Sequence, residues 1–254
     1  MTAELRNKVC LVTGASRGIG AAIATALANS GATVVIHYGS NRDAAEEVAR
    51  RLPGEGHVVL GTDLAAPENA ASLVERVLQE TGRLDVLVNN AGIYTPHPPL
   101  ETAADAWLRS WREILAVNLV SPAVLCQAAA RAMAEQGGGR IINIGSRGAF
   151  RGEPKGPAYG ASKAGLHAMS QSLAVALAPQ NIQVFGIAPG FVETDMAKSL
   201  LDSDEGDAIR HQSPLNRVAR PEEIAEAVGF LASTKADFMT GGIIDINGAS
   251  YLRT

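Results

Sequence analysis

VCLVTGASRGIG, residues 9–20, is the stretch of sequence that decides how this chain folds. Its first part, Val9–Thr13, is an apolar run with the length and composition of a buried strand. A loop with three glycines follows and leads directly into a helical pattern, Gly18–Ser30, whose apolar residues return on one face. Gly31 then suits the left-handed position that often ends a helix. A buried strand, a glycine loop and a helix in this order predict the start of an α/β fold.

The same alternation of short apolar runs and longer helical patterns continues through the rest of the chain. The runs are almost continuously apolar, which is typical of parallel strands covered by helices on both faces. No linker or shift in composition divides the sequence, so we expect a single domain, residues 1–254. The predicted fold is α/β, a doubly wound, Rossmann-type domain with a seven-stranded parallel sheet. The expected strands are Val9–Thr13, Thr33–His37, Val58–Leu60, Val86–Asn89, Ile141–Ile144, Val184–Ala188 and Ile243–Ile246, and the further expected helices are Arg42–Leu52, Glu68–Thr81, Ala103–Glu135, Ala158–Ala178 and Pro221–Ala232.

Composition and charge exclude several classes of protein. The 254 residues are 46% hydrophobic and 19% charged, which is the balance of a folded chain with a substantial core. The formal net charge of -4 provides no basic field, so neither nucleic acid nor an anionic membrane surface is an expected partner. No apolar window approaches the roughly 20 uninterrupted residues that a membrane-spanning helix needs.

Cysteine and histidine usage points to a reducing compartment without a metal site. The two cysteines, Cys10 and Cys126, lie in apolar and alanine-rich stretches and lack the spacing of a disulfide framework. The five histidines are scattered, so we expect no metal. Met1–Lys8 lacks the apolar segment of a signal peptide. These features together predict a cytoplasmic protein with reduced thiols.

The glycine loop has the context of a dinucleotide-binding fingerprint. Gly14 permits a tight turn, and Gly18 and Gly20 let the backbone approach a pyrophosphate at the positive helix N-terminus. The spacing is G-x-x-x-G-x-G rather than the commoner G-x-G-x-x-G. Residues 14–18 also fit G-x-S-x-G, the nucleophile elbow of hydrolases, so a serine hydrolase using Ser16 is an alternative. That alternative needs a histidine partner, and the sequence singles none out.

The residues after the second expected strand bear on the choice of cofactor. An NAD-preferring site places a carboxylate there for the adenine ribose hydroxyls. Residues 37–42 contain none, whereas Arg17, Ser40 and Asn41 can donate to a 2′-phosphate. We therefore expect NADP(H) to be preferred, with NAD(H) remaining possible.

Ser146, Tyr159 and Lys163 form the candidate catalytic group. Ser146 follows the fifth expected strand, and Tyr159 and Lys163 stand four residues apart on one face of the next helix. A free phenol has a pKa of about 10, too high for efficient proton exchange at neutral pH. A nearby ammonium group is expected to lower that pKa into the range of general acid and base catalysis.

These residues resemble the short-chain dehydrogenase/reductase family over essentially the whole chain. The resemblance rests on the glycine loop, the sequence NNAG at residues 89–92, Asn118, the Tyr159/Lys163 pair and the segment 189–194. It implies that Tyr159 exchanges the proton of an alcohol and Ser146 hydrogen-bonds the same oxygen. It also implies that Lys163 binds the nicotinamide ribose and Asn118 anchors a water. The implied cofactor-binding residues are Gly14, Ser16, Arg17, Gly18, Ile19, Gly20, Tyr38, Ser40, Asn41, Asp63, Leu64, Asn89, Ala91, Gly92, Tyr159, Lys163, Pro189, Gly190, Val192 and Thr194.

Substrate identity is expected to reside in the loops 93–100, 147–156 and 191–220. Residues 191–196 are similar to those of 3-oxoacyl carrier-protein reductases, which implies a small-molecule carbonyl/alcohol substrate of that or a related kind. Arg147, Arg151 and Lys155 make one flank basic, which would suit an anionic substrate or an acidic carrier, unless they are only solvated charges.

The sequence also bears on the oligomeric state of the protein and on whether it is an enzyme. The resemblance implies a homodimer formed by the long helices around Asn118 and Tyr159, or a homotetramer completed by the C-terminal region Gly241–Tyr251. A non-catalytic regulator that binds NADP(H) is the remaining alternative to an enzyme.

Overall fold

The computed structural model describes residues 4–253, so Met1–Ala3 and Thr254, which belong to the predicted domain and N-terminal segment, lie outside the described residues. Seven parallel strands form one sheet in the order β3-β2-β1-β4-β5-β6-β7, which confirms the predicted fold class. The order reverses between β1 and β4, where such sheets bind ligands beyond the carboxyl ends of the strands. The strands are β1 Val9–Val12, β2 Thr33–Tyr38, β3 Val58–Gly61, β4 Val86–Asn89, β5 Gly139–Ile144, β6 Ile182–Pro189 and β7 Ile243–Ile246.

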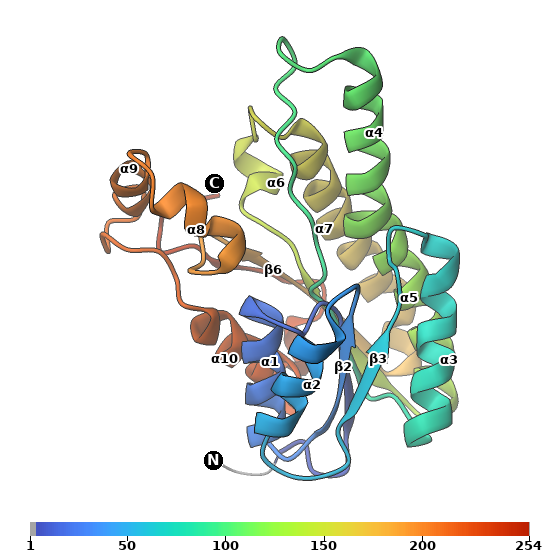
Figure 1. Ribbon diagram of the computed structural model, residues 1–254. Coiled ribbons are helices and arrows are strands. Elements are labelled where there is room, and N and C mark those ends of the chain that lie inside the picture. The colour runs from blue at the N-terminus through green and yellow to red at the C-terminus, as the bar shows by residue number, and fades with distance from the viewer. Residues whose placement is uncertain (1–3, 254) are drawn as a thin grey trace.

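Helices cover both faces of the sheet (Figure 1). One face carries α1, α2 and α10, whose core residues include Ile23, Ala45 and Val228. The other carries α3, α5 and α7, with Leu73 and Leu125 among its core residues. The helices are α1 Gly18–Asn29, α2 Arg42–Arg51, α3 Ala70–Thr81, α4 Ala104–Leu115, α5 Ser121–Glu135, α6 Gly148–Arg151, α7 Pro157–Leu177, α8 Asp195–Leu201, α9 Gly206–Arg210 and α10 Pro221–Leu231, with short turns η1 Pro67–Asn69, η2 Ala116–Val120, η3 Ala178–Gln180 and η4 Thr234–Met239.

The predicted helix over 103–135 is interrupted. It consists of α4 and α5 joined by η2, a π-helical turn that contains Asn118. Such turns are frequent at functional sites, and no period in the sequence marks this one. The combined stretch Ala104–Glu135 is long and apolar enough to span a membrane by length and composition alone. Half of its apolar window is buried inside the fold, as in the core helix of a globular protein, so the support for a membrane span is weak.

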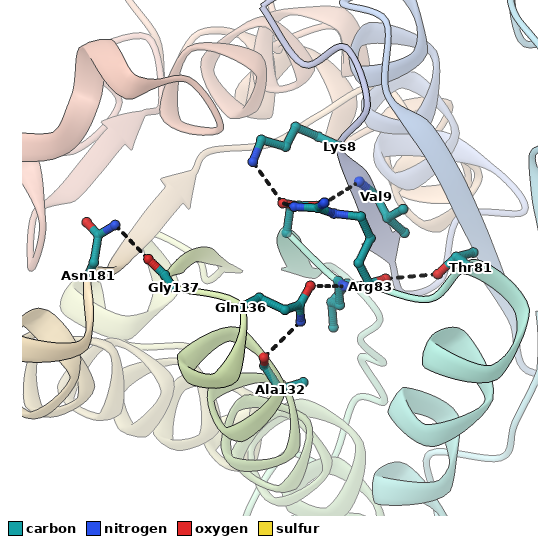
Figure 2. Close-up of polar contacts among 10 residues, drawn as sticks. Lys8, Val9, Thr81, Arg83, Ala132, Gln136, Gly137 and Asn181 are labelled. Atoms are coloured by element: carbon teal, nitrogen blue, oxygen red, sulfur yellow. Dashed lines mark hydrogen bonds and ion pairs between the residues drawn. The ribbon is translucent and has the colours of Figure 1, made fainter.

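A buried carboxylate ties the amino ends of the strands together. Asp85 accepts hydrogen bonds from Lys8 Nζ at 2.9 Å, from the Val9 backbone N–H at 2.9 Å and from two nitrogens of Arg83 at 2.7 Å each. Figure 2 shows Lys8, Val9 and Arg83 converging at this point, with Gln136 beside them. Burial alone would raise the pKa of Asp85, but the hydrogen bonds from Arg83, Val9 and Lys8 outweigh it and hold that pKa below its usual value.

Asp85→Asn is expected to lower the free energy of unfolding at neutral pH by about 1–3 kcal/mol, because charged donors lose their carboxylate. A carboxyl group with a depressed pKa in the folded state stabilises the fold above its unfolded pKa of about 4. That contribution is lost as the pH falls through the lower folded pKa. Urea unfolding at neutral and acidic pH checks this prediction. The free energies of unfolding of the wild type and Asp85→Asn should differ at neutral pH and become equal in acid. The same difference at both pH values would contradict the prediction.

Candidate functional site

The carboxyl ends of β1, β4, β5 and β6 bring the predicted site residues to one edge of the sheet. The glycine loop follows β1, the NNAG segment ends β4, and Ser146 follows β5. The segment with Pro189 and Gly190 ends β6. Residues from four distant parts of the sequence therefore meet at this edge, as parallel pairing requires.

The glycine loop has little room for side chains. Gly14 has φ +62°, and a Cβ there would lie 3.0 Å from Ala91 Cα. A Cβ on Gly20 would lie 2.3 Å from the Gly14 carbonyl oxygen. Thr13 Oγ1 accepts hydrogen bonds from the backbone N–H groups of Asn90 and Ala91, each at 3.0 Å. The loop is thus locked against the end of β4 in a cradle that only glycine fits.

His37 is a site residue that the sequence interpretation missed. Its Nδ1 accepts a hydrogen bond from the Gly14 N–H at 3.1 Å, and its Nε2–H donates to the Thr62 carbonyl at 3.0 Å. Burial lowers the pKa of His37 to about 4, so the ring is neutral and able to accept. The imidazole therefore fastens the glycine loop to the end of β3. The sequence offered one signal for this role, which is that His37 ends the second expected strand.

The residues expected near the adenine ribose lie in the glycine loop after β1 and at the carboxyl ends of β2 and β3. Arg17 is exposed, with Nη1 4.0 Å from Asp195 Oδ2, and Ser40 is also exposed. Asn41 Oδ1 accepts from the Ala44 N–H and caps α2, which leaves its amide nitrogen for a ligand. Two further predicted residues have structural contacts, since Tyr38 packs over Gly61 and Asp63 Oδ1 accepts from Ala65 N–H at 2.8 Å.

Two predicted cofactor residues are buried beneath the site. Asn89 is 2% exposed, and its amide donates to Asn143 Oδ1 at 2.8 Å and to the Cys126 sulfur at 3.2 Å. Leu64 is buried as well, and its carbonyl accepts from Ser121 Oγ at 2.7 Å. The Asn89 side chain therefore belongs to the core between β4 and β5.

The side chains of Ser146 and Tyr159 are close enough for the Ser146 hydroxyl to act on the pKa of the Tyr159 phenol, which it lowers. The Ser146 Oγ also accepts from the Gly148 N–H at 3.0 Å, which fixes the hydroxyl at the start of α6. Tyr159 lies in the first turn of α7, and Tyr94 contacts its ring edge-on at a centroid distance of 5.3 Å. The predicted serine and tyrosine are therefore neighbours despite their separation in sequence.

Lys163 and Asn118 lie behind this pair. Lys163 is 4% exposed, and its Nζ donates to the Ile144 carbonyl at 2.9 Å. Asn118 is fully buried and exchanges two hydrogen bonds with the backbone of Ile93, at 2.9 and 3.0 Å. A Cβ on Gly92 would lie 3.4 Å from both Lys163 Nζ and Asn118 Oδ1, which places these two polar groups around the same point.

The phenol pKa differs from the sequence expectation. Burial raises the pKa of Tyr159 to about 12, with the Ser146 hydroxyl opposing that rise and the charge of Glu153 adding to it. Burial also lowers the pKa of Lys163 to about 8. The Lys163 Nζ lies 5.7 Å from the centroid of the Tyr159 ring. The predicted lowering of the phenol pKa by Lys163 is therefore wrong for this structure, because desolvation dominates.

The segment after β6 closes the edge of the site. The Gly190 N–H donates to the Ile246 carbonyl, and a Cβ on Gly190 would lie 3.0 Å from the backbone of Asn247. Val192 is buried and forms a parallel bridge with Ala219. A Cβ on Gly18 would lie 3.3 Å from the Thr194 methyl group, so this segment touches the glycine loop. The remaining predicted residues, Ser16, Ile19 and Pro189, lie in these two segments.

A second histidine missed by the sequence interpretation supports Tyr159. His97 is fully buried, with Nδ1 2.7 Å from the Thr95 carbonyl and Nε2 accepting from the Ala158 N–H at 3.1 Å. Helix α7 has no side-chain cap at its N-cap residue, so His97 satisfies one of its free N–H groups. The imidazole therefore holds the turn that carries the phenol.

Comparison with known proteins gives the family. A sequence profile described as enoyl-(acyl carrier protein) reductase matches residues 14–249. This chain belongs to the short-chain dehydrogenase/reductase family. As a short-chain dehydrogenase/reductase it is an oxidoreductase that acts on CH–OH groups of small molecules and uses a nicotinamide cofactor.

Three relatives match almost end to end. The chain is 40% identical to cis-4-hydroxycyclohexanecarboxylate dehydrogenase of Sinomonas cyclohexanicum over 95% of this chain and 96% of that protein. It is 39% identical to 3-oxoacyl-[acyl-carrier-protein] reductase of Aquifex aeolicus over 99% of this chain and 100% of that protein. The enzyme of that name from Escherichia coli is 40% identical over 98% and 99% of the two chains.

The hydrolase alternative has no base in this short-chain dehydrogenase/reductase. Among residues 4–253, no histidine forms a hydrogen bond with Ser16. The histidine hydrogen bonds are all with backbone groups, and His37 uses its Nδ1 to hold the Gly14 N–H of the glycine loop. The G-x-S-x-G match is therefore a by-product of the glycine loop.

Proposed function

We propose that the protein interconverts a ketone and a secondary alcohol with NADP(H), using Tyr159, Ser146, Lys163 and Asn118. The observation that carries this proposal is the approach of the Ser146 hydroxyl to the Tyr159 phenol, whose pKa it lowers, with Lys163 Nζ 5.7 Å from the centroid of the same ring. A serine and a tyrosine whose hydroxyl groups are neighbours can both reach one substrate oxygen.

The residues at the sheet edge fit a dinucleotide. The cradle at Gly14 and Gly20 excludes side chains where a backbone must approach a pyrophosphate, and it lies at the N-terminus of α1. Gly92, Pro189 and Gly190 would border the nicotinamide half. When bound, the cofactor supplies or accepts a hydride.

The proton step follows from the pKa values. At neutral pH Tyr159 is protonated, because its pKa is raised to about 12. In ketone reduction its hydroxyl donates this proton to the oxygen that becomes the alcohol, while Ser146 donates a second hydrogen bond to the same oxygen. Lys163, whose pKa is lowered to about 8, is mostly protonated at neutral pH and is suited to return a proton towards Tyr159.

The natural substrate is proposed to be a 3-oxoacyl or related ketone. Full-length similarity to two 3-oxoacyl-[acyl-carrier-protein] reductases supports this class, and similarity to a hydroxycyclohexanecarboxylate dehydrogenase supports a cyclic alternative. We further propose that the protein works in the cytoplasm as a homodimer or homotetramer. Val175 on α7 and Phe238 in η4, both almost fully exposed, support an assembled state.

The test is consumption of NADPH with a panel of 3-oxoesters, cyclic ketones, diketones and quinones. Turnover of at least one ketone supports the proposal. Tight NADPH binding without turnover of any carbonyl would instead identify a non-catalytic regulator.

The preference for NADP(H) is proposed to depend on Arg17. Its exposed guanidinium can bind a 2′-phosphate, with the free amide of Asn41 and the hydroxyl of Ser40 as further donors. Arg17→Glu is expected to lower kcat/KM for NADPH relative to NADH by at least about tenfold. Arg42→Glu is the matched control, because Arg42 already pairs with Glu46 at 2.7 Å. Equal ratios in the wild type and Arg17→Glu would contradict the assignment.

A further inference from the structure

Three cations flank the segment after Ser146, and the structure separates them into two kinds. Lys155 is exposed and forms an ion pair with Glu205 at 3.4 Å. Arg147 and Arg151 form no ion pair within residues 4–253. Two arginines without a counterion therefore lie close to the proposed catalytic serine.

The two guanidinium groups converge on one neutral oxygen. Arg147 Nη2 donates to Gln212 Oε1 at 2.5 Å, and Arg151 Nη1 donates to the same oxygen at 3.0 Å. A further nitrogen of Arg147 donates to Ser250 Oγ. Two like charges that meet at an amide oxygen repel each other, whereas a carboxylate oxygen in the same place would attract both.

Arg147 is also buried, which makes the missing counterion costly. It is 4% exposed, and its Cζ lies over the Phe191 ring, 5.0 Å from the centroid. Burial first, and then the charge of Arg151, lower the pKa of Arg147 to about 10, so it remains charged at neutral pH. An unpaired buried charge destabilises a fold, which indicates that it serves a ligand.

A cavity opens beside this arginine. It has a volume of about 280 Å³ and lies between Phe191, the residues after α9 and the end of β7. The three other charged residues on its wall already have partners: Arg217 and Glu223 pair with each other at 2.7 Å, and Asp245 pairs with Arg253 at 2.8 Å. Among the described residues, Arg147 is thus the charged residue on the cavity wall that has no counterion.

Glu153 is a carboxylate whose charge acts on these arginines, but it forms no ion pair with either of them among the described residues. Its side chain lies against Gly148 and Gly160, where a Cβ on Gly148 would be 2.4 Å from Oε1. Burial raises the pKa of Glu153, and the charges of Arg151 and Arg147 only oppose that rise from a distance. The arginines therefore retain a net positive charge beside the proposed catalytic pair.

We propose that Arg147 and Arg151 bind a carboxylate group carried by the substrate. This inference rests on the proposed function, because Arg147 directly follows Ser146 in the chain. A planar guanidinium matches a carboxylate in a two-pronged hydrogen bond, and the Gln212 amide oxygen marks the place of one carboxylate oxygen. The substrate class is an oxo acid in reduction, and the corresponding hydroxy acid in oxidation.

The test compares oxo acids of increasing chain length with their matching amides, using the full-length protein and NADPH. The wild type is expected to show a KM for the preferred acid roughly 10- to 100-fold below that for its amide, the range of a charged hydrogen bond. Arg151→Met, at an exposed position, and Arg147→Met should each remove this difference in KM between the acid and its amide. Lys155→Met is the matched control and should preserve it.

Gln212→Glu is a second variant that tests the proposal even if Arg147→Met fails to fold. The new carboxylate would sit between the two guanidinium groups, so the melting temperature should rise and the preference for acids should disappear.

An equal KM for acid and amide in the wild type, or a preference that survives in Arg151→Met and Gln212→Glu, would overturn the inference. If added acetate alters turnover of a neutral ketone while acids gain nothing over amides, the site binds a free carboxylate and the substrate assignment is wrong. Absence of turnover with every ketone and amide would contradict the proposed function instead. In that case a rise in melting temperature with oxo acids, present in wild type and absent in Arg151→Met, still supports the carboxylate site, and its absence refutes it.

Discussion

Tyr159→Phe is expected to lower kcat for ketone reduction by about 100- to 10,000-fold, the usual contribution of a positioned general acid. In the proposed mechanism the phenol donates the proton that the product alcohol retains, and phenylalanine keeps the ring but removes the donor. NADPH should still bind, because the glycine loop and the β6 segment are untouched. Stopped-flow measurement of NADPH consumption and fluorescence titration of NADPH give the two quantities.

Tyr94→Phe is the matched control for this prediction. Tyr94 lies edge-on to Tyr159 at a centroid distance of 5.3 Å and loses the same hydroxyl group. Its removal should change kcat much less than the loss of Tyr159. If Tyr159→Phe keeps wild-type turnover, or if both variants lose activity equally, Tyr159 is not the proton donor.

Gly20→Ala is the second substitution with a large expected effect. The added Cβ would lie 2.3 Å from the Gly14 carbonyl oxygen and 2.6 Å from Asn90 Nδ2, and the first of these is backbone that cannot rotate away. Overpacking of this kind is expected to destabilise the protein by about 1–3 kcal/mol. Displacement of the loop should also weaken NADPH binding by at least about tenfold, which corresponds to roughly 1.4 kcal/mol.

Gly229→Ala is the control for the same chemical change elsewhere. Gly229 lies inside α10, and a Cβ there would meet nothing within 4 Å. Alanine in a helix interior should stabilise the protein by about 0.5–1 kcal/mol and leave NADPH binding alone. Thermal unfolding and NADPH titration of both variants check the pair. Wild-type affinity and stability in Gly20→Ala would show that the cradle is not required.

Strands β1 and β4 were predictable because their apolar runs are buried on both faces. All four residues of β1 and of β4 are buried, and the sequence alone marks both runs. The short helices α6, α8 and α9 were not predicted, since four to seven residues carry too little periodicity. The π-helical turn at Asn118 was missed for a related reason, because its neighbours continue a helical pattern on both sides.

The roles of the polar residues divide in the same way. Tyr159 and Lys163 were placed on one helical face by their spacing of four residues, which is a local property. His37 and His97 were not singled out, because each acts on a backbone N–H that lies 23 or 61 residues away in the chain. The prediction that the pKa of Tyr159 is lowered was wrong, because the shift depends on burial and burial depends on every element that covers the phenol.

The sequence by itself determined the parallel α/β fold, the glycine cradle and the serine, tyrosine and lysine of the site, since all of these depend on residue type and local spacing. Only the tertiary structure decided which charges are paired. Lys155 was indistinguishable from Arg147 and Arg151 in the sequence, yet it has a carboxylate partner 50 residues away while they share one amide oxygen. Burial and ion pairing arise from contacts between distant segments, and these exist only once the sheet has brought the segments together.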